Sequence, residues 1–231
     1  MPIKTLGILG GMGPSATIYF YQKILGLTPA KIDQDHIPTL IFSNTLIPDR
    51  TQAIENHTET HGKNALIKSA QTLEKSGADF IAIPCNTAHF WIESLQSAID
   101  IPILNMIKLT ADHLEKKGTN SVGILATVGT FKTQLYQKSC SENGLIVTIP
   151  TPSQQEKIMT AIKAVKSSSE SIQNRHQIQQ AMDHLYEKGA EEIVLGCTEL
   201  PLLIDNRTHT TDPMDILAQY SVNLALGLSS K

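Results

Sequence analysis

Residues 77–85 read Gly-Ala-Asp-Phe-Ile-Ala-Ile-Pro-Cys, and residues 189–197 read Gly-Ala-Glu-Glu-Ile-Val-Leu-Gly-Cys. Each stretch opens with Gly-Ala, continues through a short apolar run and ends at a cysteine, Cys85 or Cys197. A short run of apolar residues bounded by Gly or Pro is typical of a strand buried in a parallel sheet. The sequence therefore predicts two equivalent strands, each with a cysteine at its carboxyl end.

Two further pairs of segments extend this similarity along the chain. Residues 5–13 and 121–129 share Gly-Ile-Leu and end in glycine, and residues 102–106 resemble residues 210–214 more weakly. The pairs are offset by 116, 112 and 108 residues, in the order 5–13, 77–85 and 102–106. Blocks that recur in the same order at nearly constant spacing indicate two copies of one unit.

Helical patterns separate the predicted strands. Residues 65–76 carry apolar side chains close to the spacing of one helix face, and Gly77 follows as a C-terminal stop signal. Residues 178–188 repeat the pattern before Gly189. Strands that alternate with helices favour an α/β fold with parallel sheets.

We therefore predict an α/β protein with two pseudosymmetric lobes, each a parallel sheet flanked by helices, and an active site in the cleft between them. The first lobe comprises residues 1–106 plus 213–231 and carries Cys85. The second comprises residues 107–212 and carries Cys197. In this arrangement the C-terminal helix, from about Met214, returns to the first lobe.

Composition excludes several functional classes. The chain has 231 residues, a net charge of −3 and few aromatic residues, so it lacks the basic surface that binds nucleic acid. Its longest apolar runs fall far short of the roughly 18 residues that span a bilayer, and the N-terminal apolar run is too short and too glycine-rich for a signal peptide. Three cysteines do not form a secreted disulfide framework. We expect a cytoplasmic protein with free thiols and neither a membrane nor a nucleic-acid partner.

Cys85 and Cys197 are the candidate reactive groups. Ligands of open α/β sheets bind beyond the carboxyl ends of strands, and the Asn-Thr and Thr-Glu that follow these cysteines are typical of helix starts. A helix N-terminus stabilises a thiolate, so we expect lowered thiol pKa values. Two thiols on opposite faces of a ligand suit stereoinversion at carbon, because one removes a proton while the other delivers one. Cys140 has no counterpart and is expected to pack in the core.

Two other cysteine chemistries fit less well. Disulfide exchange usually uses a Cys-x-x-Cys pair, which is absent. A metal site would need more ligands, and the eight histidines show no paired spacing with these cysteines. We expect no metal.

Residues 6–14, Leu-Gly-Ile-Leu-Gly-Gly-Met-Gly-Pro, predict a strand that runs into a glycine loop. Such a loop can present backbone N–H groups to an anion. It matches neither the dinucleotide fingerprint nor the P-loop. A small carboxylate fits it best, and a purely structural turn is the alternative.

Taken together, these motifs resemble the aspartate/glutamate racemase family, the cofactor-independent amino-acid racemases. The segments that carry the resemblance are residues 7–14, 44–51, 84–89, 125–130, 195–201 and 212–215. The two cysteine motifs are the specific part of the match, and the glycine loop alone would be weak. The resemblance implies a homodimer and no cofactor.

The same resemblance implies roles for individual residues. Cys85 and Cys197 are the acid/base thiols, and Arg50 clamps a substrate carboxylate. The implied substrate-binding residues are Gly11, Met12, Arg50, Asn86, Thr87, Thr127, Lys166, Thr198 and Glu199. Asn86, Thr87 and Thr198 would donate to the α-carboxylate, and Glu199 would bind the ammonium group or orient Cys197.

The sequence also gives expectations for a lysine, a histidine and two aromatic side chains. The family's lysine is usually followed two residues later by Gly, whereas Lys166 precedes Ser167 and Ser168, so Lys163 is an alternative. His89 is expected to pack or to support Cys85 rather than to relay a proton. Phe90 and Trp91 are expected in the core.

Two cationic groups suit a substrate with two carboxylates, aspartate or glutamate. These differ by one methylene, worth only about 1–3 kcal/mol in a fitted pocket, so the sequence leaves the choice open. One alternative is a related enzyme, namely a hydantoin racemase, an arylmalonate decarboxylase or a maleate isomerase. Another is a catalytically idle protein that binds acidic amino acids.

Overall fold

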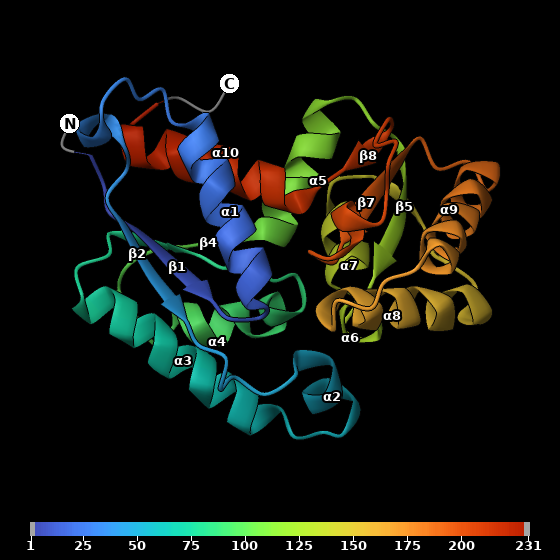
Figure 1. Cartoon of the computed structure of the whole chain (residues 1–231), viewed down its shortest axis with the longest axis horizontal. Coiled ribbons are helices and arrows are strands. Elements are labelled where there is room, and N and C mark those ends of the chain that lie inside the picture. The colour runs from blue at the N-terminus through green and yellow to red at the C-terminus, as the bar shows by residue number, and fades with distance from the viewer. Residues whose placement is uncertain (1–2, 229–231) are drawn as a thin grey trace. The chain divides into compact units, whose positions relative to one another are not determined.

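The computed structural model describes residues 3–228, which form two compact units (Figure 1). Unit 1 contains residues up to Met106 and from Met214 onward, and unit 2 contains Ile107–Pro213. Pro213, which we expected in the first lobe, is therefore grouped with the second.

Unit 1 is built on a four-stranded sheet with the order β2-β1-β3-β4, in which every pairing is parallel. Its strands are β1 (Leu6–Gly10), β2 (Thr39–Ser43), β3 (Phe80–Ala82) and β4 (Ile103–Leu104). Its helices are α1 (Pro14–Leu27), η1 (Asp33–Asp35), α2 (Arg50–Glu55), α3 (Glu59–Lys75), η2 (Thr87–Trp91), α4 (Ile92–Gln96) and α10 (Pro213–Leu226).

Unit 2 repeats this plan with the order β6-β5-β7-β8, again parallel throughout. Its strands are β5 (Ser121–Ala126), β6 (Ile146–Thr148), β7 (Glu192–Gly196) and β8 (Thr210–Thr211). Its helices are α5 (Met106–Lys116), α6 (Val128–Lys132), α7 (Leu135–Glu142), α8 (Pro152–Lys166), α9 (Ile172–Glu187) and η3 (Leu200–Leu202). The predicted duplicated α/β fold with two parallel sheets is confirmed.

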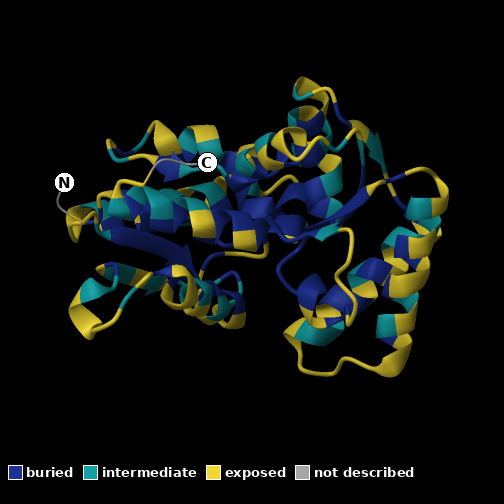
Figure 2. Cartoon of the chain, turned by 90° about the horizontal axis from the view of Figure 1, so that it is seen from above, coloured by how far each residue is buried: buried dark blue, intermediate teal, exposed yellow. Residues whose placement is uncertain are grey.

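Strands β1, β3 and β7, and β5 beyond Ser121, are buried because helices cover both faces of each sheet (Figure 2). In unit 2, Ile193 and Leu195 of β7 pack with α8 and α9, whereas Val194 packs with α5 and α7. This alternation follows from the two-residue period of side chains along a strand.

Both helices that precede the cysteine-bearing strands end at a left-handed glycine. Gly77 has φ +95° and Gly189 has φ +91°, and the N–H of the residue after each glycine donates to a carbonyl five residues earlier at 3.1 Å. Both helices begin earlier than their apolar pattern predicted. For α9 the reason is a capping box, in which Ser171 and Asn174 bond reciprocally.

Helix α10 packs with the N-terminal part of the chain. The N–H of Lys4 donates to Ala225 O at 3.0 Å, and Lys23 of α1 pairs with Asp215 of α10. The last helix thus completes unit 1 although more than a hundred residues separate it from β4.

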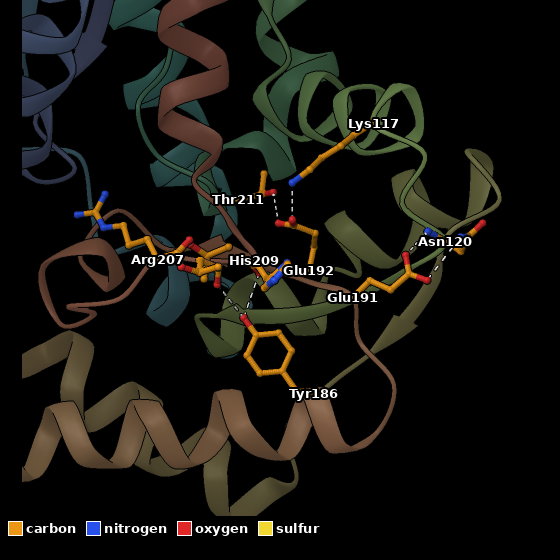
Figure 3. Close-up of polar contacts among 10 residues, drawn as sticks. Lys117, Asn120, Tyr186, Glu191, Glu192, Arg207, His209 and Thr211 are labelled. Atoms are coloured by element: carbon orange, nitrogen blue, oxygen red, sulfur yellow. Dashed lines mark hydrogen bonds and ion pairs between the residues drawn. The ribbon is translucent and has the colours of Figure 1, made fainter.

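A group of polar contacts lies at the amino end of the second sheet (Figure 3). Glu192, buried at the start of β7, pairs with Lys117 and accepts a hydrogen bond from Thr211 Oγ1 at 3.0 Å. Tyr186 donates from its hydroxyl to His209 O at 3.0 Å. Cys197 lies beyond the opposite, carboxyl end of the same strand.

No helix among residues 3–228 is long and apolar enough to cross a membrane.

Candidate active site residues

The strand register places the two cysteines at equivalent positions. Gly7 of β1 pairs with Ile81, and Gly123 of β5 pairs with Ile193. Four residues beyond these partners lie Cys85 and Cys197, respectively. The duplication inferred from the sequence is therefore also a duplication of register.

Cys85 is buried in a short turn between β3 and η2. Its N–H donates to Ile83 O at 2.8 Å, and its carbonyl lies 2.9 Å from Nδ1 of His89. Asn86 and Thr87 follow Cys85 in the sequence as the N-cap and first residue of η2, and both are buried. The backbone of Cys85 is thus held on both sides.

Cys197 is held through its side chain. Its Sγ donates to Glu199 Oε2 at 3.0 Å, and Thr198 Oγ1 donates to the same oxygen at 3.0 Å. Glu199 is only 7% exposed. A buried carboxylate needs such hydrogen-bond donors, since it has left water.

The expected lowering of the thiol pKa is wrong for Cys197. Burial raises the pKa of Cys197 well above its usual range, and the Glu199 carboxylate raises it further, while Lys166 lowers it in part. The expected helix is a single turn that begins only at Leu200, with Glu199 as its N-cap. A three-residue turn provides too short a dipole to offset burial beside a carboxylate.

Arg50 has the surroundings of an anion-binding cation. It is the first residue of α2 and only 9% exposed. Its guanidinium donates to Pro48 O at 3.1 Å and Met12 O at 3.2 Å, and more weakly to Ile47 O at 3.4 Å. Its Nε is buried without a hydrogen-bond partner. Burying a charge is costly unless an opposite charge accompanies it, so this site suits a carboxylate.

At Gly11 the glycine loop after β1 differs from the expectation that its N–H faces an anion. The N–H of Gly11 donates to Thr17 Oγ1 at 2.9 Å, so it is not open to an anion. Gly11 has φ +90°, and a Cβ there would lie 2.4 Å from the backbone of Asn44. Gly11 therefore serves the close approach of two loops, whereas Met12 contributes the carbonyl that holds Arg50.

The remaining predicted residues lie in unit 2. Thr127 is the N-cap of α6, and its Oγ1 accepts from the N–H of Thr130 at 3.2 Å. Lys166 ends α8, and its charge acts on Cys197. Of the two candidate lysines, Lys166 is the one whose charge lowers the pKa of Cys197.

Two predictions concerned packing. Cys140 is buried on α7, and burial raises its pKa to about 12, as an inert core thiol requires. Trp91 is buried as predicted, but the prediction for Phe90 is wrong because its side chain is 41% exposed. Phe90 instead packs its ring edge-to-face with Trp91, with centroids 5.2 Å apart.

Sequence reasoning missed two hydrogen-bond partners. One is Thr17, whose hydroxyl satisfies Gly11, and its place one turn into the helix after a glycine loop was the available signal. The other is the N–H of Met106, which donates to Nε2 of His89 at 3.1 Å. Nothing in the spacing of residues 89 and 106 indicates this contact, because it depends on β3 and β4 being neighbours.

Two parallel sheets of one strand order, each followed after its third strand by a buried cysteine, define a duplicated α/β protein with a thiol at the equivalent position of each unit. A sequence model of the Asp/Glu/Hydantoin racemase family matches residues 9–220. The chain belongs to this family.

Individual relatives agree with this membership. The broad specificity amino-acid racemase RacX of Bacillus subtilis (strain 168) is 32% identical over 205 residues, covering 87% of this chain and 88% of RacX. The structure of Picrophilus torridus aspartate racemase matches with a TM-score of 0.85 and 32% identity, covering 96% of this chain and 94% of that one.

A glutamate racemase structure from Francisella tularensis subsp. tularensis SCHU S4, in complex with D-glutamate, matches with a TM-score of 0.73. It is 15% identical and covers 100% of this chain and 85% of that one, so this similarity is one of fold.

Proposed function

We propose that this protein interconverts the L and D forms of an acidic amino acid, aspartate or glutamate, without a cofactor, using Cys85 and Cys197. The observation that carries the proposal is the equivalent register of the two thiols in two copies of one unit. A racemase must treat both faces of Cα alike, and a duplicated fold provides the same side chain twice.

The reaction is a pair of proton transfers. One thiolate takes the α-proton from one face of the amino acid, the C–H electron pair stays at Cα, and the opposite thiol delivers its proton to the other face. The hydrogen bond from Cys197 to Glu199 keeps the proton on Cys197. We therefore assign Cys197 as the proton donor in the direction in which Cys85 removes the α-proton, with the roles exchanged in the reverse direction.

The charge of the substrate follows from Arg50 and Lys166. Arg50 is a buried cation whose hydrogen-bond partners among residues 3–228 are carbonyl oxygens, and a substrate carboxylate would supply the missing opposite charge. Lys166 is the second cation, placed where its charge acts on Cys197. Fixed cations also stabilise the negative charge that develops at Cα.

The first test is incubation of the purified protein with L-aspartate and, separately, L-glutamate in deuterated buffer with reductant and no added cofactor. Chiral chromatography with mass spectrometry measures the D-isomer and its Cα deuterium. We expect a deuterated D-isomer, lost in Cys85→Ala and in Cys197→Ala but retained in the matched control Cys140→Ala.

Other outcomes separate the alternatives. Neither D-isomer nor deuterium exchange with either amino acid would contradict the proposal and favour another enzyme of the family. A ligand-induced rise in Tm without turnover would favour an idle binding protein. Exchange without inversion would show that only one thiol works.

A second test concerns the side-chain carboxylate. Arg50→Lys keeps the charge but loses the planar fork. We expect KM for the acidic substrate to rise roughly 10- to 100-fold, the loss of a charge-assisted hydrogen bond. Arg175→Lys, at an arginine that pairs with the exposed Asp205, is the matched control. An unchanged KM in Arg50→Lys would mean that Arg50 does not bind that carboxylate.

A further inference from the structure

The His89 ring joins two backbone segments at the carboxyl edge of the first sheet. His89 lies on η2 and is 1% exposed. Its Nδ1 lies 2.9 Å from the carbonyl oxygen of Cys85, and its Nε2 accepts the N–H of Met106 at 3.1 Å. Cys85 follows β3 and Met106 follows β4, which are paired neighbours in the sheet.

The polarity of these partners defines the protonation of the ring. A backbone N–H only donates, so Nε2 carries no proton; a carbonyl only accepts, so Nδ1 carries the hydrogen. His89 is therefore a neutral imidazole that donates to Cys85 and accepts from Met106. Burial lowers the pKa of His89 and outweighs the hydrogen bonds to the backbone of Cys85, Leu104 and Asn86, which raise it, so the neutral form is supported.

Through these two hydrogen bonds, His89 connects the turn that carries Cys85 to the first residue of α5. Met106 is the first residue of α5, whose early N–H groups have no partner within the helix. The chain passes from unit 1 to unit 2 between Met106 and Ile107. His89 thus ties the carbonyl of Cys85 to the backbone of Met106, and both residues belong to unit 1.

The second unit holds its thiol by other means. At the equivalent turn the Cys197 carbonyl accepts from the N–H of Leu200 at 3.1 Å, and Glu199 holds Sγ directly. By the register equivalence, Pro201 occupies in unit 2 the position that His89 has in unit 1, and proline has no ring donor. Among residues 3–228, a side chain therefore holds the cysteine carbonyl at Cys85, whereas a backbone N–H does so at Cys197.

We propose that His89 is a positioning residue for Cys85, which it holds by donating from Nδ1 to the Cys85 carbonyl while Nε2 anchors the ring on Met106. The inference rests on the proposed function of Cys85 as a proton-transfer group. A displacement of about 1 Å can cost on the order of 100-fold in rate. By fixing the backbone of Cys85, His89 can therefore affect the rate without touching the substrate.

Three variants separate the two hydrogen bonds. The amide of His89→Asn reaches the Nδ1 position and can still donate to Cys85, whereas that of His89→Gln reaches the Nε2 position and can still accept from Met106. His89→Ala loses both bonds. His61→Asn, an exposed histidine on α3, is the matched control.

The readouts are kcat, KM, Tm and the rate at which iodoacetamide alkylates Cys85, measured against Cys197 in the same molecule by peptide mass spectrometry. We expect His89→Gln and His89→Ala to lower kcat at least tenfold with KM changed less than threefold. Both should alter the Cys85 to Cys197 alkylation ratio. His89→Asn should recover most of kcat and the ratio, and His61→Asn should match wild type.

Three results overturn the inference. One is a loss of kcat that follows Tm across all three variants while the alkylation ratio stays at the wild-type value, as simple packing predicts. A second is a rise in KM with unchanged kcat, which would mean that His89 binds substrate. The third is recovery by Gln rather than Asn.

If the wild-type protein neither racemises nor exchanges either amino acid, the proposed function fails. In that case the alkylation ratio still decides whether His89 positions Cys85.

Discussion

Cys85 and Cys197 are the same residue type in equivalent places, yet their surroundings differ. His89 holds the backbone of Cys85, while Glu199 holds the sulfur of Cys197. Duplication of the strand therefore does not impose identical chemistry on the two thiols, since the residues that follow each strand are different.

Glu199 provides the first prediction at this scale. Glu199→Gln keeps a hydrogen-bond acceptor near Sγ but removes a negative charge that disfavours the thiolate, so the pKa of Cys197 should fall. Burial, the largest cause of its raised pKa, remains. The pH dependence of Cys197 alkylation, read by peptide mass spectrometry, should move to lower pH.

Glu191→Gln is the control for this prediction. Glu191 precedes β7 at the other end of the strand, where it accepts from Asn120. An alkylation profile for Glu199→Gln that stays in place or moves to higher pH would show that the Glu199 charge does not act on Cys197.

At the scale of elements, glycines determine how closely loops and strands approach. Gly11 is the clearest case, because its φ is positive and the backbone of Asn44 occupies the space of a side chain. Gly11→Ala should lower the free energy of unfolding by about 2–4 kcal/mol, from left-handed strain and overpacking together.

Gly26→Ala provides the contrast in urea unfolding followed by circular dichroism. Gly26 lies on α1 with open space around its Cα, so alanine should be neutral or should stabilise by up to about 1 kcal/mol. Equal effects at the two positions would show that the contact with Asn44 costs little.

Helices and strands were predictable to the extent that local signals mark them. Apolar runs before Cys85 and Cys197 and the glycines at 77 and 189 indicated strands and helix ends correctly. The start of α3 was not predicted, because its first turn is polar and carries no apolar stripe. Phe90 was misplaced since aromatic character alone does not say which side of a short helix faces the core.

At the scale of the whole molecule, α10 belongs to unit 1 although the other helices and strands of that unit precede Met106 in the sequence. Leu217 on α10 is fully buried, and the single tryptophan, Trp91, lies in the core of unit 1. Leu217→Ala should lower the stability of unit 1 by about 2–5 kcal/mol, the cost of a core cavity. Trp91 fluorescence during urea unfolding should report the shift.

Gln219→Ala, at an exposed position of the same helix, should change stability by no more than about 0.5 kcal/mol. If Leu217→Ala left the Trp91 transition in place while circular dichroism shifted, α10 would not stabilise unit 1.

The sequence by itself determined the duplicated α/β plan, the two parallel sheets and the pair of cysteines at strand ends, because strand period, glycine stops and internal repeats are local properties of the chain. Only the tertiary structure decided that Gly11 donates to Thr17, that Arg50 is a buried cation held by carbonyls, and that His89 reaches Met106. It also reversed the expected pKa of Cys197. Burial and hydrogen-bond polarity depend on which distant segments pack together, and that information appears only when the sheets form.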